Sequence, residues 1–528
     1  MVTETYETTI VSVDPATLER VGSVPVSAPN NLDQAVETAR DAARVWARQP
    51  LTARSRLLRS IGVALLEASD EVSTAIVAES GKPRLEALTA DVFVALDVSR
   101  WLARNAARLL ADERLPMRQP YLAHKRARLR YEPCGVVGIV SPWNFPLGVP
   151  FTQALTAIAA GNAVVLKPSE LTPLTGAWIE ELLRRAGAPE GLVSVVQGTG
   201  GIVGARLVSH PGVDHLLFTG STTTGRAVAA AAAERLLPAV LELGGKDPML
   251  VLDDADLGRA VEGALWGAFT NCGQVCSGIE RIYVAASCHD AFVERLVTRT
   301  RQLRIGHGMK DGVDLGPLIS EARRTEVEAL VADAVQAGAT IATGGARPET
   351  GLPGWFHEPT ILLGEPERAR LRDEEIFGPV VTVVSVEDEE DGIARANASP
   401  FGLGASVWSR DARRAHRVAS AIEAGSVWTN DHAYSYGACQ APWGGTKASG
   451  HGRTHSKHGL YAMSQVKFLD SDSGRLRPPW WYPYGARATD GFRGALTTLY
   501  SQGMAARARS AARHRRELVA LGRRMFKP

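Results

Sequence analysis

Hydrophobic residues in the first hundred positions recur every three to four residues, the period of an amphipathic helix. One stripe runs from Leu32 to Trp46 and ends before Pro50, and two more predict a helix from Thr52 and another over residues 91–110. Ahead of these helices, residues 9–13 and 21–26 alternate on either side of a turn, which predicts a β-hairpin. We assign these apolar stripes to the protein core.

From residue 135 the pattern changes to short apolar runs that alternate with helical segments. Four such runs lie at residues 135–140, 163–166, 192–196 and 215–218. This alternation is typical of βαβ units, which build a parallel sheet with ligands at the carboxyl ends of its strands. A second alternating series follows Gly244-Gly245, so we expect a second α/β domain that begins near residue 247.

Composition narrows the class of protein. A chain of 528 residues is too long for one core and should form two or three domains. Its net charge of +2 argues against nucleic acid as a partner. Five scattered cysteines argue against a disulfide framework and for a reducing compartment. Residues 1–6 show no signal peptide and no run of about 20 apolar residues spans a bilayer, so we predict a cytoplasmic protein.

The segment from Trp266 to Cys276 holds the first candidate for chemistry. Cys276 follows Gly273, and a glycine allows the sharp turn that exposes a nucleophilic sulfur. The alternative for a cysteine without a partner is a buried structural thiol.

Two further motifs supply groups that a nucleophilic cysteine needs. Asn144 lies between two prolines in Ser141-Pro-Trp-Asn-Phe-Pro146, so its amide is held rigidly and can stabilise an oxyanion. Taken alone, Asn144 is more often a turn residue that satisfies local backbone groups. Glu242 lies between two leucines before Gly244-Gly245, a setting typical of a desolvated general base.

Two loops suggest a dinucleotide site. In Lys167-Pro-Ser-Glu170, a lysine and a carboxylate three residues apart suit the hydroxyls of an adenosine ribose, although a solvated ion pair explains the spacing equally well. The segment Phe218–Gly225 follows a strand and opens a helix, where backbone amides can bind a pyrophosphate.

These motifs occur in the order seen in the aldehyde dehydrogenase superfamily, which the chain resembles over residues 8–467. The matching motifs are SPWNFP, KPSE, FTGST-x2-G, LELGGK, F-x-N-x-G-Q-x-C ending at Cys276, Glu374–Pro379, Pro442–Lys447 and Ser449–Arg453. The resemblance implies NAD(P)-dependent oxidation of an aldehyde to a carboxylic acid through a cysteine thiohemiacetal and a thioester.

The resemblance also implies an α/β fold with a Rossmann-type cofactor domain, an α/β catalytic domain and a β-hairpin oligomerisation arm. A strand over residues 461–470 is expected to join the arm across a dimer, so we expect a homodimer or homotetramer. The expected bounds are 1–115 and 135–246 for the NAD-binding domain, 116–134 and 455–470 for the arm, 247–454 for the catalytic domain and 471–528 for a tail.

Site roles follow from the resemblance residue by residue. Cys276 resembles the nucleophile, Asn144 with the Cys276 backbone N–H resembles the oxyanion hole, and Glu242 resembles the base that activates water. Glu170 favours NAD, and NADP stays open. The residues expected to contact the cofactor are Ser141, Trp143, Lys167, Ser169, Glu170, Gly200, Phe218, Gly220, Ser221, Gly244, Glu375 and Phe377.

Two positions bear on the aldehyde. Thr152 stands where several members place a bulky aromatic residue in the substrate tunnel, which indicates a roomier tunnel and a medium-chain, long-chain or aromatic aldehyde. Thr270 stands where some succinic semialdehyde members carry an arginine, and succinic semialdehyde is the alternative substrate. The chemistry needs no metal. We expect His451, His455 and His458 to share a helical face without forming a metal site.

The tail beyond residue 470 falls outside the resemblance. From Arg475 onward it carries 12 basic residues against Asp490 and Glu517, with a Pro- and aromatic-rich stretch before a predicted Arg-rich helix at residues 505–526. We favour aromatic residues that pack on the enzyme or a second subunit. The alternative is peripheral contact with an anionic membrane.

Overall fold

The computed structural model describes residues 8–122, 124–472 and 474–525. The chain divides into a large unit, residues up to 110 and 132–465, and a small unit, residues 111–131 and 466 onward. The expectation for residues 1–6 lies outside the described residues. Within the described part, no helix has the length and hydrophobicity needed to cross a bilayer.

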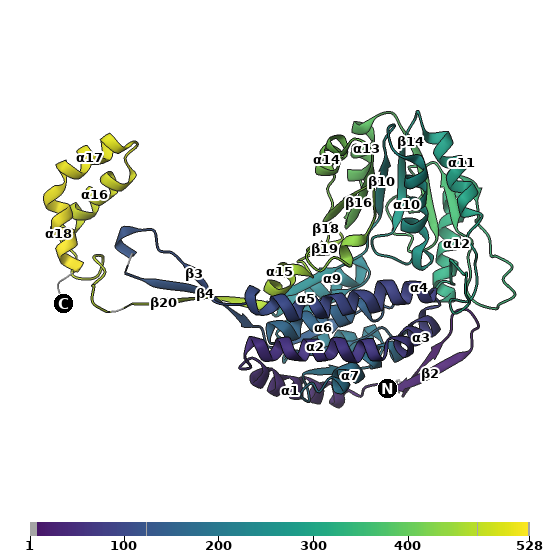
Figure 1. Cartoon of the computed structure of the whole chain (residues 1–528), viewed down its shortest axis with the longest axis horizontal. Coiled ribbons are helices and arrows are strands. Elements are labelled where there is room, and N and C mark those ends of the chain that lie inside the picture. Colours follow the sequence, from purple (N-terminus) through teal and green to yellow (C-terminus); the bar gives the residue numbers. More distant parts are fainter. Residues whose placement is uncertain (1–7, 123, 473, 526–528) are drawn as a thin grey trace, which may run out of the picture. The chain divides into compact units, whose positions relative to one another are not determined.

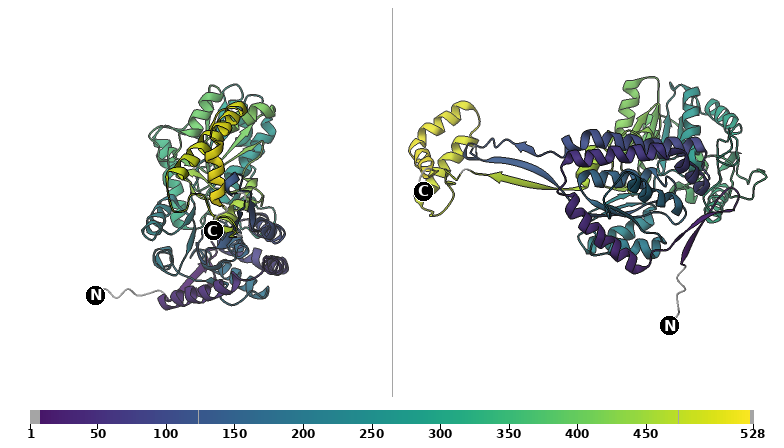
Figure 2. Two further views of the ribbon diagram at one scale, coloured as in Figure 1. Left: turned by 90° about the vertical axis from the view of Figure 1, so that its left-hand side faces the viewer. Right: turned by 60° about the horizontal axis from the view of Figure 1, so that its bottom comes forward.

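The large unit begins with the predicted hairpin and a layer of helices. The buried residues Leu32, Val36 and Trp46 confirm the first apolar stripe, and α2 and α5 lie side by side (Figures 1 and 2). The third predicted helix starts as a π-helix. The elements are β1 (Thr9–Val13), β2 (Arg20–Pro25), α1 (Pro29–Trp46), α2 (Leu51–Glu67), α3 (Ser69–Ser80), α4 (Arg84–Glu86), η1 (Ala87–Phe93) and α5 (Val94–Leu109).

A six-stranded sheet follows, ordered β19-β9-β8-β5-β6-β7. Its predicted strands are parallel and almost wholly buried, as expected for apolar runs covered on both faces. The strand order reverses between β5 and β8, which places a crevice at their carboxyl ends. The elements are β5 (Val136–Val140), α6 (Gly148–Ala160), β6 (Ala163–Lys167), α7 (Pro173–Arg185), β7 (Val193–Val195), η3 (Gly200–Gly204), α8 (Ala205–Ser209), β8 (His215–Thr219), α9 (Thr222–Glu234), β9 (Ala239–Glu242) and the antiparallel β19 (Gly450–His451).

The second predicted series forms a seven-stranded sheet, ordered β12-β13-β14-β11-β10-β16-β17, that starts at Asp247. It is parallel except for the edge strand β12. The elements are β10 (Asp247–Val251), α10 (Leu257–Phe269), η4 (Thr270–Gly273), β11 (Ile279–Ala285), α11 (His289–Thr300), α12 (Glu321–Gln336), β12 (Thr340–Thr343), β13 (Thr360–Leu363), η5 (Arg370–Arg372), β14 (Val380–Val386), α13 (Glu389–Asn397), β15 (Phe401–Gly402), β16 (Gly404–Trp408), α14 (Ala412–Ala421), β17 (Ser426–Thr429), η6 (Tyr434–Tyr436), β18 (Thr446–Lys447) and α15 (Ser456–Ala462).

The small unit differs from the sequence-based expectation in three ways. Residues 456–462 form α15 of the large unit, so the strand begins at Ser464. This strand pairs with the hairpin of its own chain, in the order β20-β4-β3. The tail forms three helices: Gly503, at φ 79°, separates α16 from α17, and the helix expected at residues 505–526 is divided at His514 into α17 and α18. The elements are β3 (Glu113–Leu115), η2 (Pro120–Leu122), β4 (Arg126–Pro133), β20 (Ser464–Ser471), α16 (Ala486–Tyr500), α17 (Met504–Arg513) and α18 (Arg515–Met525).

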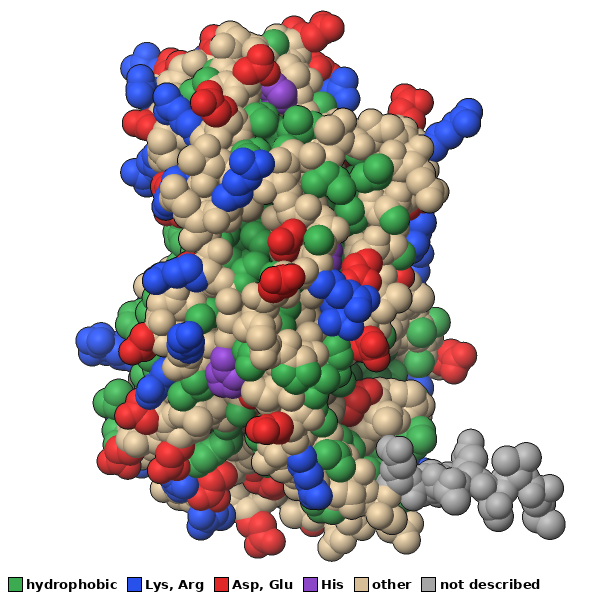
Figure 3. Space-filling model, turned by 90° about the vertical axis from the view of Figure 1, so that its right-hand side faces the viewer, with side chains coloured by type: hydrophobic (Ala, Val, Ile, Leu, Met, Phe, Trp, Pro, Cys, Tyr) green, Lys and Arg blue, Asp and Glu red, His purple; other side chains and the backbone are tan. Residues whose placement is uncertain are grey.

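Charged side chains are mixed on the face of the molecule shown in Figure 3. Blue and red groups alternate there, and no continuous basic surface is visible on that face. This distribution agrees with the near-neutral net charge.

Candidate active site

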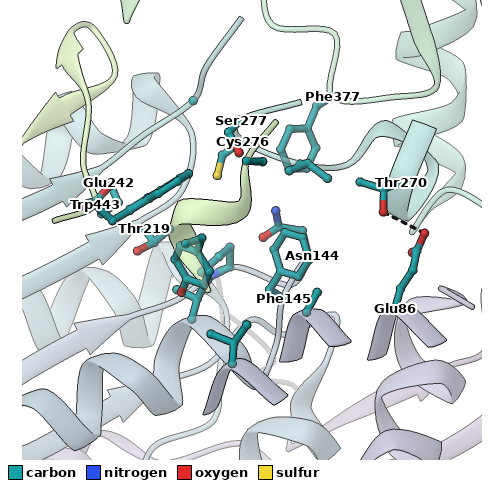
Figure 4. Close-up of a pocket in the computed structure, with 18 of the residues that line it drawn as sticks. Glu86, Asn144, Phe145, Thr219, Glu242, Thr270, Cys276, Ser277, Phe377 and Trp443 are labelled. Atoms are coloured by element: carbon teal, nitrogen blue, oxygen red, sulfur yellow. Dashed lines mark hydrogen bonds between the residues drawn. The ribbon is translucent and has the colours of Figure 1, made fainter. Parts of the chain in front are cut away.

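The main cavity of the large unit has a volume of about 580 Å³ and contains residues from the carboxyl ends of both sheets (Figure 4). Nine of the residues predicted from the sequence line it, and all three predicted catalytic groups are among them. The nine are Trp143, Asn144, Gly220, Ser221, Glu242, Gly244, Cys276, Glu375 and Phe377.

Cys276 reaches this cavity because the chain turns sharply just before it. Asn271, Cys272 and Gly273 adopt φ values of 51°, 54° and 69°. A Cβ on Gly273 would lie 2.1 Å from the carbonyl oxygen of Gly378, so this turn requires glycine. The Cys276 side chain is partly exposed to the cavity, whereas Cys272 is buried in a separate apolar cluster. Burial and the nearby carboxyl of Glu375 raise the pKa of the Cys276 thiol.

Asn144 is held more firmly than its flanking prolines alone predict. Its backbone carbonyl accepts hydrogen bonds from Lys82 Nζ at 2.6 Å and from Asn271 Nδ2 at 3.0 Å. Its own Nδ2 donates to the Gln274 carbonyl at 3.1 Å. Lys82 forms a fully buried ion pair with Asp91 at 3.0 Å. The sequence analysis missed this pair, because neither residue belongs to a recognisable motif.

Glu242 ends strand β9 and lines the cavity near Cys276 (Figure 4). Neither of its buried carboxylate oxygens has a hydrogen-bond partner among the described residues. Burial raises the pKa of Glu242 well above its ordinary value, and Arg453 and Thr454 lower it by less. A carboxyl group with these properties can accept a proton near neutral pH, as a general base must.

One wall of the cavity is suited to a flat ring. Trp143 and Phe377 lie edge to face with ring centroids 5.4 Å apart. Glu375 accepts a hydrogen bond from Gly245 N at 3.1 Å, and burial raises its pKa to about 8. A Cβ on Gly244 would lie 2.2 Å from the Glu375 carboxylate, so glycine allows this carboxylate to lie close to the backbone.

The remaining predicted cofactor residues lie outside the main cavity, at neighbouring strand ends. Lys167 and Glu170 form an ion pair of 2.6 Å, and Glu170 accepts a hydrogen bond from Gly200 N at 3.2 Å. Ser221, which lines the main cavity, caps α9 by accepting from Thr224 N, and the N-terminus of α9 lies at the crevice where a pyrophosphate would bind. These groups fit a dinucleotide. Ser141, Ser169 and Phe218 are buried at the ends of β5, β6 and β8.

Besides Trp143 and Phe377, further aromatic side chains and one further acid line the cavity. Glu86, at the end of α4, accepts hydrogen bonds from Thr270 Oγ1 and Asn271 N, both at 2.9 Å (Figure 4). Burial raises the pKa of Glu86 to about 7. The aromatic side chains here are Phe93, Phe145, Trp266, Tyr434, Tyr436 and Trp443. No sequence motif marked Glu86 or these aromatic residues as a group.

The structure bears on two expectations about this region. Thr152 is not among the described residues that line the main cavity, and its hydroxyl donates to Gly148 O at 2.7 Å. The widening of the tunnel by Thr152 stays a prediction. His451 lies in strand β19 and His455 precedes α15, so His451, His455 and His458 share no helical face.

Comparison with known proteins agrees with this site. The sequence model of the aldehyde dehydrogenase family matches residues 2–469. The chain belongs to the aldehyde dehydrogenase family. An aminoaldehyde dehydrogenase of Arabidopsis thaliana is 38% identical over 479 residues, which cover 89% of this chain and 94% of that protein. A betaine aldehyde dehydrogenase of Mesorhizobium japonicum is 39% identical over 468 residues, with coverages of 88% and 94%.

A solved structure extends the similarity to three dimensions. Betaine aldehyde dehydrogenase of Staphylococcus aureus, in complex with NAD+, matches with a TM-score of 0.85 and 34% identity, covering 90% of this chain and 96% of that one. The enzyme is thus an oxidoreductase that oxidises an aldehyde with NAD or NADP, and the α/β fold with a Rossmann-type cofactor domain is confirmed.

Proposed function

We propose that this aldehyde dehydrogenase oxidises an aldehyde that carries an ammonium or quaternary ammonium group. The observation that carries the proposal is that Glu86 and several aromatic side chains line the same cavity as Cys276. A cation is attracted both to the faces of aromatic rings and to a carboxylate, and aromatic cages bind quaternary ammonium groups. The relatives named for aminoaldehydes and betaine aldehyde support the same class.

Charge in the cavity argues against succinic semialdehyde. Among the described lining residues, the basic side chains are Arg323 and His432. Arg323 interacts with Glu326 and Glu375, on the cofactor side. Burial lowers the pKa of His432 to about 4, so this ring is neutral near pH 7. A second carboxylate on the substrate would therefore meet Glu86 without a cation to balance it.

The chemical steps follow from the positions of three groups. Cys276 attacks the aldehyde carbon, and Asn144 Nδ2 together with the Cys276 N–H stabilises the oxyanion. Bound at Lys167, Glu170 and the N-terminus of α9, NAD(P) would supply the hydride acceptor. Glu242 then takes a proton from water, which attacks the thioester and releases the acid. The Glu170 carboxylate at the ribose position favours NAD, because it would repel a 2′-phosphate.

The arm provides a surface for assembly, and we propose that it forms a homodimer or homotetramer. Strand β20 is an edge strand of the small unit, and its Val466 and Phe468 side chains are exposed. An exposed edge of this kind pairs readily with another strand. The Val466→Lys variant should lower the mass measured by light scattering, and an unchanged mass would place the interface elsewhere. Cytoplasmic location stays a prediction from the sequence.

A matched pair of aldehydes tests the proposed substrate class. Betaine aldehyde and 3,3-dimethylbutanal have nearly the same shape, but only the former carries a positive charge. We expect a higher kcat/KM for betaine aldehyde, measured as NADH formation. Equal values, or a preference for hexanal or benzaldehyde, would favour the apolar medium-chain or aromatic substrates expected from the sequence. A preference for succinic semialdehyde would contradict the charge argument.

A further inference from the structure

A buried ion pair lies close in sequence to two of the catalytic motifs. Lys246 Nζ and Glu280 Oε2 are 2.6 Å apart, and the two side chains are 0% and 6% exposed. Lys246 directly follows Gly244-Gly245, and Glu280 lies four residues after Cys276. Neither is among the described residues that line the main cavity. Any effect of the pair on the reaction must therefore pass through the residues that it contacts.

Stability alone does not explain this pair. A buried ion pair contributes little net stability, because taking both charges out of water costs about as much as their attraction provides. The hydrogen bonds that Glu280 accepts from the backbone give it a more specific role.

Glu280 accepts from two consecutive N–H groups of a neighbouring loop. Its Oε1 accepts from Ile376 N at 2.8 Å and from Phe377 N at 3.0 Å, and its Oε2 lies 3.0 Å from Ile376 N. The loop, residues 374–379, lies between η5 and β14 and is neither helix nor strand. Buried N–H groups outside regular structure need an acceptor from another part of the chain. Glu280 supplies that acceptor to the 374–379 loop.

The 374–379 loop has a backbone conformation that needs such support. Phe377 has a φ of 49°, in the left-handed region that residues other than glycine rarely adopt. Strain of this kind persists only where the surrounding structure imposes it, and it is concentrated at functional sites. The hydrogen bond from Phe377 N to Glu280 fixes the strained residue itself.

The same loop contacts both sides of the reaction centre. The Phe377 ring packs on Trp143 to form the wall suited to a flat ring. One residue further along, the carbonyl of Gly378 lies so close to Gly273 that a Cβ there would be only 2.1 Å away. Gly273 belongs to the turn that presents Cys276. A displacement of the 374–379 loop would therefore change the wall and the turn relative to each other.

Hydride transfer is sensitive to such a displacement. The carbon that loses the hydride is attached to Cys276, and the ring that accepts it would lie against Trp143 and Phe377. A misplacement of about 1 Å between reacting groups can lower a rate roughly 100-fold.

We propose that Glu280, paired with Lys246, is a positioning residue that holds the 374–379 loop in the geometry required for hydride transfer. Lys246 balances the charge of the Glu280 carboxylate and fixes its direction. The inference requires only aldehyde oxidation with NAD or NADP, and it is independent of the ammonium specificity. The adenosine side of the cofactor site, at Lys167 and Glu170, lies elsewhere and is unaffected.

A pair of double variants isolates the hydrogen-bond acceptor. Glu280→Leu/Lys246→Met removes both charges and the acceptor, so no unpaired charge stays buried. Glu280→Gln/Lys246→Met also removes both charges, but its amide oxygen can still accept from the loop. A third variant, Glu280→Asp, keeps the ion pair and withdraws the carboxylate by one methylene group.

Two measurements separate positioning from folding. Stopped-flow absorbance follows NADH with enzyme in excess over propanal, so each aldehyde reacts once and deacylation does not affect the signal. Propanal deuterated at its aldehyde carbon shows whether hydride transfer limits that rate. Calorimetry measures the binding of AMP, which reports the adenosine side alone, and of NAD, which reports both halves of the site.

The single-turnover rate should fall at least about tenfold in Glu280→Leu/Lys246→Met, with a primary deuterium isotope effect, because misplacement slows the hydride step. It should stay near wild type in Glu280→Gln/Lys246→Met and fall at least about threefold in Glu280→Asp. AMP should bind every variant as it binds the wild type, whereas NAD should bind Glu280→Leu/Lys246→Met more weakly.

A wild-type rate in Glu280→Leu/Lys246→Met would overturn the proposal, and if that variant does not fold, a wild-type rate in Glu280→Asp would do so. An equally slow Glu280→Gln/Lys246→Met would show that the charges rather than the acceptor matter. A slow rate without an isotope effect would place the defect in the attack of Cys276, and loss of AMP binding would show general damage to the cofactor domain. Each of these three results would also overturn it.

Discussion

Replacing Glu86 by glutamine tests whether its charge selects the substrate. The amide keeps the size of the carboxyl group, and its oxygen can still accept from Asn271 N, which donates to Glu86 at 2.9 Å. The Glu86→Gln variant should therefore fold and turn over neutral aldehydes at the wild-type rate. It should lose the preference for betaine aldehyde over 3,3-dimethylbutanal.

The size of the effect follows from Coulomb's law. Two unit charges about 6 Å apart at an effective dielectric constant of about 20 attract by roughly 3 kcal/mol. Some of this attraction is lost because the substrate cation leaves water. We therefore expect a loss of about 1–2 kcal/mol, or roughly 5- to 30-fold in kcat/KM for betaine aldehyde.

The pH dependence gives the effect a second signature. Burial raises the pKa of Glu86 to about 7, so the carboxyl is neutral below this pH and charged above it. The attraction is present above about pH 7 and is lost as the pH falls. Well below the pKa, the charged fraction of Glu86 decreases roughly tenfold for each pH unit. Betaine aldehyde keeps its charge throughout, so the titrating group belongs to the enzyme.

The assay is the ratio of kcat/KM for the two aldehydes across this pH range. Taking the ratio removes the titration of Cys276 and Glu242, which affects both substrates equally. The control is Glu71→Gln, because Glu71 is an exposed acid of α3 whose removal changes the net charge by the same amount. A ratio that stays constant with pH and is the same in Glu86→Gln would refute the role of Glu86 in selecting a cation.

Three further predictions concern other parts of the chain. Cys276→Ser should lose dehydrogenase turnover but keep NAD binding, measured by calorimetry, and retained turnover would remove Cys276 from its role. Glu242→Gln should produce one NADH per active site and then turn over at least about a hundredfold more slowly; steady wild-type turnover would place the base elsewhere. Because we favour tail aromatic residues that pack on protein, phosphatidylserine vesicles should not sediment the full chain; sedimentation that a Trp481→Ala/Tyr482→Ala variant loses would support the membrane alternative, since both side chains are exposed and the tail is rich in arginine. Equal sedimentation of both chains would exclude these aromatic residues as the contact.

Much of the fold could be predicted because local pattern and tertiary structure agree. Buried parallel strands read as continuous apolar runs, and β5, β6 and β8 lie where those runs predicted them. The edge strands β12 and β19 escaped prediction because they are short and gain their partners from distant parts of the chain. The pairing of β20 with β4 of the same chain escaped prediction for a related reason, since it joins residues more than 300 positions apart.

The catalytic motifs were visible for a different reason. Cys276, Asn144 and Glu242 each lie at a strand end or tight turn, where glycine and proline mark the backbone geometry in the sequence. Lys82 and Glu86 lie in or beside ordinary helical segments. They act on the site through contacts with Asn144, 62 positions away from Lys82, and with Thr270, 184 positions away from Glu86. Their role depends on which helix packs against the loop before Cys276, and no local pattern records that.

His455 shows how a correct spacing can support a wrong structure. The intervals between His451, His455 and His458 fit one helical face only if the backbone is helical, and two left-handed residues interrupt it at His455 and Ser456. The interruption turns the His455 imidazole inward beside Thr454, while His451 stays in an exposed strand.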